Sequence, residues 1–237
     1  IKSSAASDVY KRQNDNSAIN ARPVSASERF PFNCTGCAAC CRHVPTSVAL
    51  ECLDIFRLTK YFRDRDTSIK TTDDFLARYA EPVLLDDCGF IIYMLKVQGD
   101  DDACIFLKEN RCSIQEVKPR VCRIYPFIAS PTANGRFEYM VSLEHPHHFQ
   151  GATVSVKRWM NRFFFAEEKE ALHMDYQSVP KIAGLMRRIP AHNRHRAVAL
   201  FLWYRYSDYD LKHSFLEQFS ANMEKLKLEL QALAAEK

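Results

Sequence analysis

Apolar residues recur every three or four positions along several stretches of this chain, the spacing that gathers them on one face of an α-helix. Residues 48–62 follow this rhythm. Residues 72–80 form a shorter stretch that opens at Thr72, a residue suited to capping, and ends before Pro82. Four further helices are predicted towards the C-terminus, over residues 154–174, 181–188, 193–206 and 208–235. The longest of them carries a sustained apolar seam that can pack on the core or pair with a protein partner.

Between these helices, shorter stretches have the composition and alternation of β-strands. Residues 88–97 are rich in Ile, Tyr and Val, and residues 136–143 alternate between apolar and polar. Residues 104–107 and 112–114 predict a small hairpin, and residues 119–122 a short helix that starts at a proline. The fold class is therefore α+β: a small cysteine-rich core of short strands and helices, followed by an all-helical C-terminal region.

Changes of composition along the chain predict three segments. Residues 1–28 form a polar lead that we expect to be disordered, residues 29–152 a cysteine-rich metal-chelating domain, and residues 153–237 a helical C-terminal region. Residues 1–13 resemble a translated sequencing adapter, which would place them outside the native protein. Because this stretch carries three basic residues against one acidic residue, its removal would lower the formal charge from +4 to +2.

Composition and charge exclude several classes of function. Of the 237 residues, 47% are apolar, enough for a packed core. The formal net charge of +4 gives no polybasic field of the kind that binds nucleic acid or anionic membranes, so neither is predicted as a partner. The longest apolar runs, residues 90–95 and 197–204, are too short for a helix that spans a bilayer, which needs roughly 18 residues.

The nine cysteines are the informative feature of the composition. All of them lie between Cys34 and Cys122, so the chemistry is concentrated in one region of the chain. Their odd number, and a start without the apolar run of a secretory leader, argue against a disulfide scaffold. We therefore expect a reducing compartment, the cytoplasm, and thiols that bind metal in place of structural disulfides.

Four of the cysteines form a compact chelating motif. Cys34, Cys37 and Cys40 are separated by two residues each. At this spacing a tight turn, here allowed by Gly36, directs two sulfurs at one centre. Cys41 follows directly, and because adjacent side chains diverge, the motif predicts two metal sites or one multinuclear site. The predicted thiolate ligands, which select zinc, iron or an iron-sulfur cluster over magnesium or calcium, are Cys34, Cys37, Cys40, Cys41, Cys104, Cys112 and Cys122.

Charge gives an independent criterion for such a site. Seven thiolates around two zinc ions leave an excess of negative charge, which a half-buried site must neutralise. Basic residues adjoin the cysteines or lie between Cys112 and Cys122, where they can donate hydrogen bonds to sulfur or serve as ordinary surface charges. These residues are Arg42, Arg111, Lys118, Arg120 and Arg123.

The order of the motifs resembles that of the YkgJ-like CxxCxxCC family, which is described as zinc- or iron-chelating. The elements that carry the resemblance, within about residues 32–151, are Cys34-x-x-Cys37-x-x-Cys40-Cys41, Cys104-Ile-Phe-Leu, Arg111-Cys112-Ser-Ile and Lys118-Pro-Arg-Val-Cys122-Arg-Ile-Tyr-Pro-Phe. The chain departs from the family at two positions. Lys118 stands where members usually have arginine, and His145 where they tend to have a cysteine. Because histidine also binds metals, the resemblance implies His145 as an eighth ligand, with His147 or His148 as alternatives.

Two cysteines lie outside the motif. Cys52 falls on the apolar face of its predicted helix and is interpreted as a small buried hydrophobe, whereas the role of Cys88 stays open. The metal stays open as well. The first three motif cysteines begin a ferredoxin-like run, but Val44 stands at its fourth position, while zinc accepts either four thiolates or three thiolates and one imidazole. Structural disulfides and thiol redox catalysis are the alternatives to a metal, although no strand is predicted before Cys34, as a thioredoxin-like site requires.

An enzyme is one alternative function. The flagellin lysine-N-methylases also resemble this family through a CxxCxxCC segment, which would imply methyl transfer. The chain, however, has no GxGxxG loop and no CxxxCxxC triad. A catalytic zinc would need a neighbouring acid or base, for which Glu116 and His43 are candidates.

A nucleic-acid or protein adaptor is the other alternative. Residues 157–165 and 187–196 combine basic and aromatic side chains, as RNA-binding segments do. At helical spacing, however, Trp159, Phe163 and Phe164 fall on one face, which is typical of core packing. The sequence therefore favours metal chelation and leaves the biological process undefined.

Overall fold

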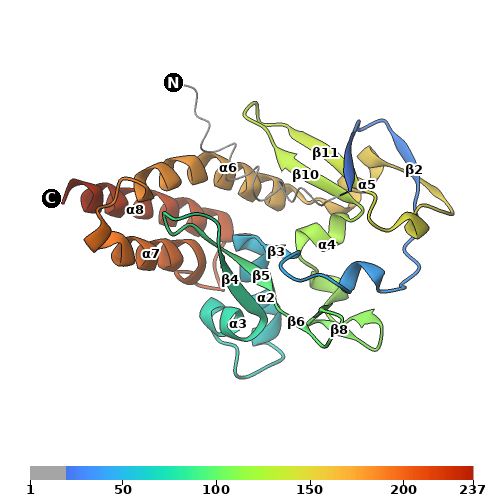
Figure 1. The fold of residues 1–237 in the computed structure, drawn as a ribbon, viewed down its shortest axis with the longest axis horizontal. Coiled ribbons are helices and arrows are strands. Elements are labelled where there is room, and N and C mark those ends of the chain that lie inside the picture. The colour runs from blue at the N-terminus through green and yellow to red at the C-terminus, as the bar shows by residue number, and fades with distance from the viewer. Residues whose placement is uncertain (1–19, 237) are drawn as a thin grey trace. The chain divides into compact units, whose positions relative to one another are not determined.

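The computed structural model describes residues 20–236, and within this range the chain forms seven α-helices and twelve short strands (Figure 1). The strands form five small sheets of two or three strands each. The predicted α+β class and helical C-terminal region are therefore confirmed. No helix in this range is long and apolar enough to cross a bilayer.

The described residues divide into two compact units that alternate along the chain. Residues 20–49 and 95–169 form one, here called the cysteine unit. Residues 50–94 and 170–236 form the other, the helical unit. The domain boundary proposed at residue 152 does not coincide with these transitions and stays a prediction. Residues 1–13, interpreted as adapter-derived, lie outside the described residues.

The cysteine unit is built on antiparallel pairings between distant parts of its chain. β1 (Ala21–Val24), β11 (Phe137–Ser142) and β10 (Phe127–Pro131) form a sheet in the order β1-β11-β10. β2 (Arg29–Pro31) pairs with β12 (Thr153–Ser155). Part of the lead that the sequence predicts to be disordered is thus strand β1. Its Pro23 suits an edge strand, but four residues without alternation give no strand signal in the sequence.

Two shorter ladders of the same unit carry cysteines. β6 (Val97–Gln98) pairs with β7 (Ala103–Cys104), and β8 (Leu107–Lys108) pairs with β9 (Arg111–Cys112). The predicted hairpin is present only from Leu107 onward, because Cys104 pairs with Val97 instead. The α-helices that lie wholly in this unit are α4 (Arg120–Ile124) and α5 (Val156–Phe163).

The core of the cysteine unit is aromatic. The ring of Trp159 in α5 lies edge-on to that of Phe32, with centroids 5.3 Å apart. Its Nε1 donates a hydrogen bond of 3.0 Å to the carbonyl oxygen of Ile124. Phe163 lies against Trp159, and Phe164 is buried. The aromatic stripe of α5 therefore packs inside the unit, as the core-packing interpretation predicts.

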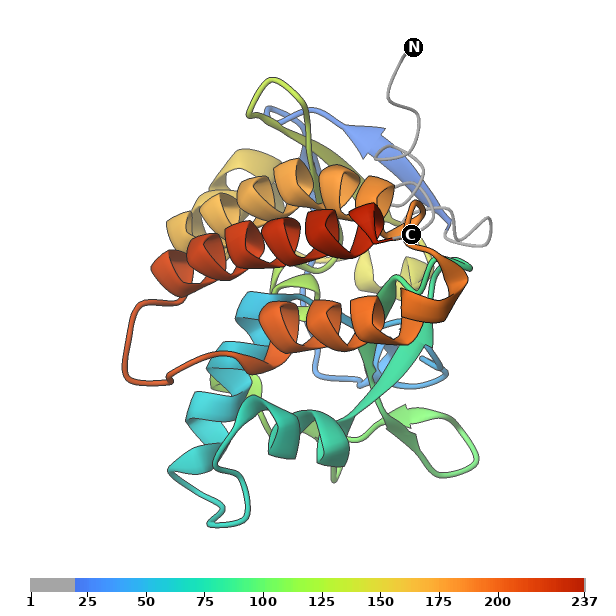
Figure 2. The ribbon, with the colours of Figure 1, turned by 90° about the vertical axis from the view of Figure 1, so that its left-hand side faces the viewer.

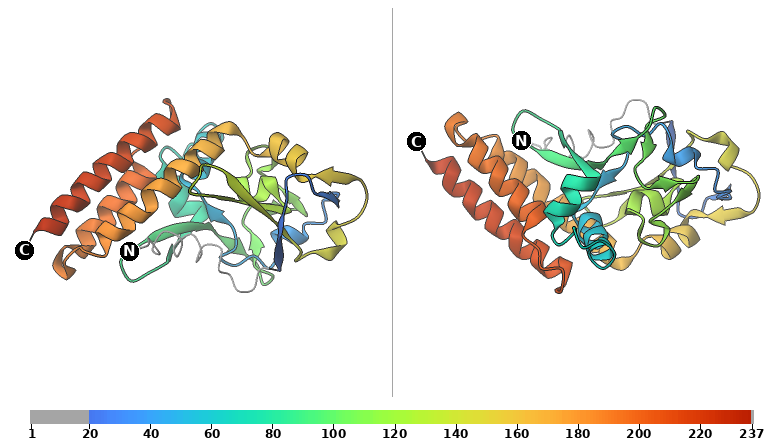
Figure 3. Two further views of the ribbon diagram at one scale, coloured as in Figure 1. Left: turned by 90° about the horizontal axis from the view of Figure 1, so that it is seen from above. Right: turned by 90° about the horizontal axis from the view of Figure 1, so that it is seen from below.

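The helical unit contains most of the long helices and one small sheet, with strands in the order β3-β5-β4. Its strands are β3 (Ala49–Leu50, of which Ala49 belongs to the cysteine unit), β4 (Ala80–Leu84) and β5 (Ile91–Leu95, of which Leu95 does). Its helices are α2 (Cys52–Arg63), α3 (Thr72–Tyr79), α6 (Ala166–Met186, of which the first turn lies in the cysteine unit), α7 (Arg194–Leu202) and α8 (Phe215–Ala235). A π-helical turn, Trp203–Ser207, continues α7. The views in Figures 2 and 3 agree that α6, α7 and α8 lie side by side.

The apolar seam of α8 is buried within the helical unit. Phe215 and Phe219 stack with ring centroids 5.3 Å apart, and Leu226 is fully buried further along the helix. Phe215 also contacts Phe56 of α2, at a centroid distance of 5.5 Å. Core packing, one of the two roles predicted for this seam, therefore accounts for its burial.

Local contacts shift several predicted helix boundaries. The first helix begins at Cys52, because the two residues before Glu51 pair as β3 and Glu51 forms a capping box with Asp54. Thr71, one residue before the predicted cap, caps α3. The helices predicted over residues 154–174 and 181–188 are instead α5 and α6, and α6 continues through Pro180. The last helix begins at Phe215, well after residue 208.

Gly89 lies in the turn before β5, where a side chain would be strained. Its φ of +90° is left-handed, and a Cβ built there would lie 2.5 Å from Cγ2 of Val198. We expect Gly89→Ala to destabilise the helical unit by about 1–3 kcal/mol, because it adds both backbone strain and a clash. Urea unfolding followed by circular dichroism measures the effect. Gly135→Ala, at φ +76° with nothing within 4 Å, is the control for strain alone. An equal loss in both variants would contradict the role of the clash.

Candidate metal centre

All seven predicted thiolate ligands belong to the cysteine unit. Four of them lie on the loop between β2 and β3, where Gly36 and Ala38 take left-handed φ values of 70° and 61° and turn the chain sharply. A 3-10 turn, Ala39–Cys41, follows. The other three thiols come from β7, β9 and α4, and are Cys104, Cys112 and Cys122. Residues 50–94, which separate the two groups in sequence, belong to the helical unit.

A first cluster joins the loop between β2 and β3, here called the motif loop, to the histidine-rich turn at residues 145–148. Sγ of Cys37 lies 3.1 Å from Nε2 of His148 and 3.5 Å from Nε2 of His147. The ligand atoms of these three residues all lie within 4.8 Å of one another, close enough to share one metal ion. Cys37 and His147 are exposed, whereas His148 is buried. We call these three residues the Cys-His cluster.

The imidazole of His148 is held from several sides. Its Nδ1 is hydrogen-bonded to the hydroxyl of Tyr125 at 2.9 Å, and its ring lies edge-on to the rings of Tyr125 and Phe32. Its carbonyl oxygen accepts from the N–H of Asn33 at 3.4 Å, and its own N–H donates to the carbonyl of His145. These contacts leave Nε2 directed at Cys37. The sequence did not identify Tyr125 as part of the site, because no spacing rule connects it with His148.

The surroundings of Cys37 favour its thiolate form. The backbone N–H of Ala39, followed by the imidazoles of His147 and His148, lowers the pKa of Cys37 from 9.0 to about 6. The thiolate is the form of cysteine that binds metals. Cys37 is therefore a ready ligand at neutral pH.

A second cluster contains the four half-buried thiols Cys41, Cys104, Cys112 and Cys122. Cys41 packs against a buried apolar group made of Ala38, Ala103 and Leu107. Ala103 precedes Cys104, and Leu107 is the cross-strand partner of Cys112. We call these four residues the four-thiol cluster.

The charges of these thiols shift one another's pKa values. A hydrogen bond with Cys40 lowers the pKa of Cys41, while burial and the charges of Cys122, Cys104 and Cys112 oppose that shift. Burial raises the pKa of Cys104, and the charge of Cys112 adds to the increase. Among the described residues, however, no three of these four sulfurs lie within 4.8 Å of one another, as the ligand atoms of the Cys-His cluster do, so the four-thiol cluster is a group of neighbouring thiols without the spacing of a formed metal site.

Backbone and side-chain contacts connect the motif loop to the β6–β7 turn. The N–H of His43 donates to the carbonyl of Asp101 at 2.8 Å, and the N–H of Val44 to that of Asp102 at 3.1 Å. Arg42 forms an ion pair with Asp101 and donates to Oδ1 of Asn110 at 2.5 Å. Cys41, next to Arg42, is thereby held beside the strand that carries Cys104.

The remaining predicted ligands lie beside the two clusters. Sγ of Cys40 lies 4.0 Å from Sγ of Cys41, and their hydrogen bond raises the pKa of Cys40. Cys34 is exposed on the same loop. The ring of His145 lies 5.1 Å from that of His148, centroid to centroid, but among the described residues the group close enough to share a metal with Cys37 is His147 and His148. The structure therefore brings together the two histidines that the family resemblance implied as alternatives to His145.

The predicted counter-charges have varied surroundings. Lys118 lies near enough to Cys40 for its charge to oppose the rise of that thiol's pKa. Arg42 and Arg123, by contrast, form ion pairs with carboxylates, Arg123 with the buried Glu168. Of the other two basic residues, Arg120 is buried and Arg111 is exposed. Glu116 and His43, the candidate acid and base of a catalytic zinc, are exposed.

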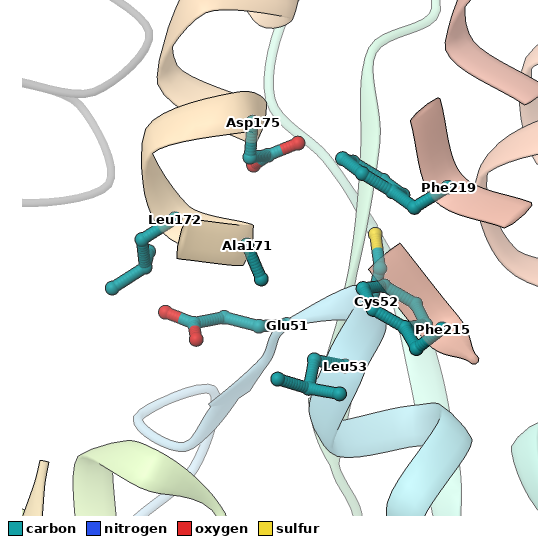
Figure 4. Close-up of a pocket in the computed structure, with 8 residues that line it drawn as sticks. All are labelled: Glu51, Cys52, Leu53, Ala171, Leu172, Asp175, Phe215 and Phe219. Atoms are coloured by element: carbon teal, nitrogen blue, oxygen red, sulfur yellow. The ribbon is translucent and has the colours of Figure 1, made fainter. Parts of the chain in front are cut away.

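The two cysteines outside the motif are buried in the helical unit. Cys52 lines a small half-open pocket with about 240 Å³ of empty volume, open solvent included, and its sulfur points toward Phe219 (Figure 4). Burial raises the pKa of Cys52 to about 12, which fits the predicted role as a small hydrophobe. Burial and the adjacent Asp86 raise the pKa of Cys88 to about 11, and its thiol donates to Oδ1 of Asp86 at 2.7 Å.

Residues 33–147, just under half of the chain, match the family described as CxxCxxCC, a putative zinc- or iron-chelating domain. This segment resembles a CxxCxxCC domain. The resemblance inferred from the motif spacing is therefore confirmed. The CxxCxxCC domain includes all seven predicted thiolates, and His148 follows its last matched residue directly. Comparisons with curated proteins and with solved structures gave no match.

Proposed function

We propose that this protein chelates zinc through the cysteines and histidines of its CxxCxxCC domain, with iron as the alternative metal. The approach of Cys37 to His147 and His148 is the observation that carries the proposal. These side chains come from segments 110 residues apart in sequence, yet their ligand atoms converge within 4.8 Å. One thiolate and two imidazoles at this separation are ligands that can hold one zinc ion.

The donor set fits zinc. Thiolate sulfur and imidazole nitrogen are the ligands that zinc prefers, and zinc accepts them in any combination of four. The lowered pKa of Cys37 supplies one thiolate at neutral pH, the form that a metal needs. Exposed neighbouring thiols such as Cys34 and Cys40 persist best in a reducing environment, so we propose that the protein acts in the cytoplasm.

Protein purified without oxygen is expected to be colourless and to contain at least one zinc ion per chain. Elemental analysis and a visible absorption spectrum measure both properties. A brown protein that contains iron and sulfide would show that the cysteines hold an iron-sulfur centre in place of zinc. A metal-free protein with paired cysteines would refute chelation.

Two serine variants make this measurement specific. Cys41→Ser removes a thiol of the four-thiol cluster and is expected to lower the metal content. Cys88→Ser is the matched control, because its hydroxyl can still donate to Asp86 and the site lies elsewhere. An equal loss of metal in both variants would show that the loss follows general destabilisation.

A further inference from the structure

The two clusters of metal-binding side chains differ in composition, burial and neighbours. The Cys-His cluster has one thiol and two imidazoles, and two of its three residues are exposed. The four-thiol cluster has sulfur ligands alone, all half-buried. We propose that Cys37, His147 and His148 form a metal site of their own, with three protein ligands and an open fourth position, separate from any metal that Cys41, Cys104, Cys112 and Cys122 bind. This inference rests on the proposed chelation of metal by the domain.

The course of the motif loop separates the two sites. Ala38 is buried with Ala103 and Leu107, the group against which Cys41 packs. Cys37, one residue earlier, contacts the histidines instead. Since Ala38 has a left-handed backbone and adjacent side chains diverge, the chain directs Cys37 and Cys41 towards different neighbours. Cys40 adjoins Cys41, at an Sγ–Sγ distance of 4.0 Å. In a single multinuclear centre, Cys40 would be the thiol that links the Cys-His cluster to the four-thiol cluster.

Charge assigns different chemistry to the two sites. A divalent zinc ion bound by one thiolate and two neutral imidazoles keeps an excess positive charge, so its open position takes water, hydroxide or an anionic ligand. Zinc bound by four thiolates keeps an excess negative charge and has no open position. The first arrangement is that of zinc sites that exchange ligands, and the second that of structural zinc sites.

Tyr125 is a positioning residue of the open site. Its hydroxyl is hydrogen-bonded to Nδ1 of His148, and a bound metal at Nε2 requires the proton on Nδ1, which then donates to that hydroxyl oxygen. Loss of such a partner typically costs 10–100-fold in metal affinity. Phenylalanine keeps the ring that packs on Phe32 and removes only the hydroxyl.

The experiment counts metal ions in the protein of 237 residues and measures their release to a colorimetric chelator. Wild-type protein is expected to contain two zinc ions per chain, released in a fast and a slow phase. Cys37→Ser and His147→Asn change exposed residues, so their circular dichroism should match the wild type while the fast phase disappears. Tyr125→Phe should weaken zinc binding in the fast phase about 10–100-fold and leave the slow phase unchanged. Cys88→Ser should retain both phases.

The outcomes distinguish this inference from the function on which it rests. Wild-type protein without metal would overturn the proposed chelation itself. One zinc ion that is unaffected by Cys37→Ser and His147→Asn would overturn the open site and leave chelation intact. A loss of all metal in every cluster variant, Cys37→Ser and Cys41→Ser alike, would show a single multinuclear centre and likewise overturn the two separate sites.

Discussion

Removing the metal from the protein of 237 residues is expected to unfold the segments around the four-thiol cluster and to leave the helical unit folded. These segments, residues 37–44 and 97–123, are here called the metal lobe. The apolar group around Cys41 consists of two alanines and one leucine, Ala38, Ala103 and Leu107. Burial of so few methyl groups contributes about 1.5–3 kcal/mol, whereas each residue ordered in a loop costs about 1–2 kcal/mol of backbone entropy. The free energy of binding zinc at a structural site, about 10–16 kcal/mol, can offset that cost.

Hydrogen exchange with and without a strong chelator measures this coupling residue by residue. The informative amides are those of His43 and Val44, which donate to the β6–β7 turn, and that of Ser113, which donates to the carbonyl of Phe106. We expect them to lose their protection when the metal is removed. The amides of β11, which pair on both sides in the β1-β11-β10 sheet next to the aromatic core, are the control within the same unit. Full protection of the metal lobe after chelation would contradict the coupling.

The parts of the fold that the sequence predicts are those with long periodic patterns. The seam of α8 and the stripe of α5 are visible as apolar spacing; in the structure the seam is buried, and the stripe packs in the aromatic core of the cysteine unit. The ladders β6–β7 and β8–β9 have two residues in each strand, too few for alternation to show. Their pairing is set by the turns between them and by contacts with the motif loop, which the sequence pattern does not encode. The predicted hairpin was therefore misplaced at Cys104.

In the candidate site, too, the sequence predicts one part and leaves another to the fold. The spacing of the motif cysteines identifies them as ligands without any knowledge of the fold. Which two of the three neighbouring histidines face Cys37 depends instead on the 3-10 turn Pro146–His148 and on Tyr125, which orients the ring of His148. Residue type alone left His145, His147 and His148 equivalent. Its burial, the hydrogen bond to Nδ1 and the packing on Phe32 distinguish His148.

Replacing Asp175 is expected to destabilise the helical unit more than any other single change of a charged residue there. Asp175 receives two hydrogen bonds, of 2.5 and 2.9 Å, from the guanidinium of Arg205. The side chain of Arg205 is only 4% exposed and lies over the rings of Phe90 and Phe201. Asp175→Ala leaves this guanidinium buried without its counter-charge. We expect a loss of about 3–5 kcal/mol in the free energy of unfolding, measured by urea denaturation with circular dichroism.

Two further variants separate the charge of this pair from its packing. Asp175→Asn keeps the shape and one acceptor, so it should cost less than alanine but leave the positive charge of Arg205 uncompensated. The double variant Asp175→Leu with Arg205→Met removes both charges and should recover most of the stability, because a buried ion pair is often replaceable by apolar side chains of similar volume. The hydrogen bond from Arg205 to the hydroxyl of Tyr206, which in turn donates to the carbonyl of Ile91, limits that recovery. A loss below about 1 kcal/mol in Asp175→Ala would mean that Arg205 is solvated, and would contradict the burial on which this prediction depends.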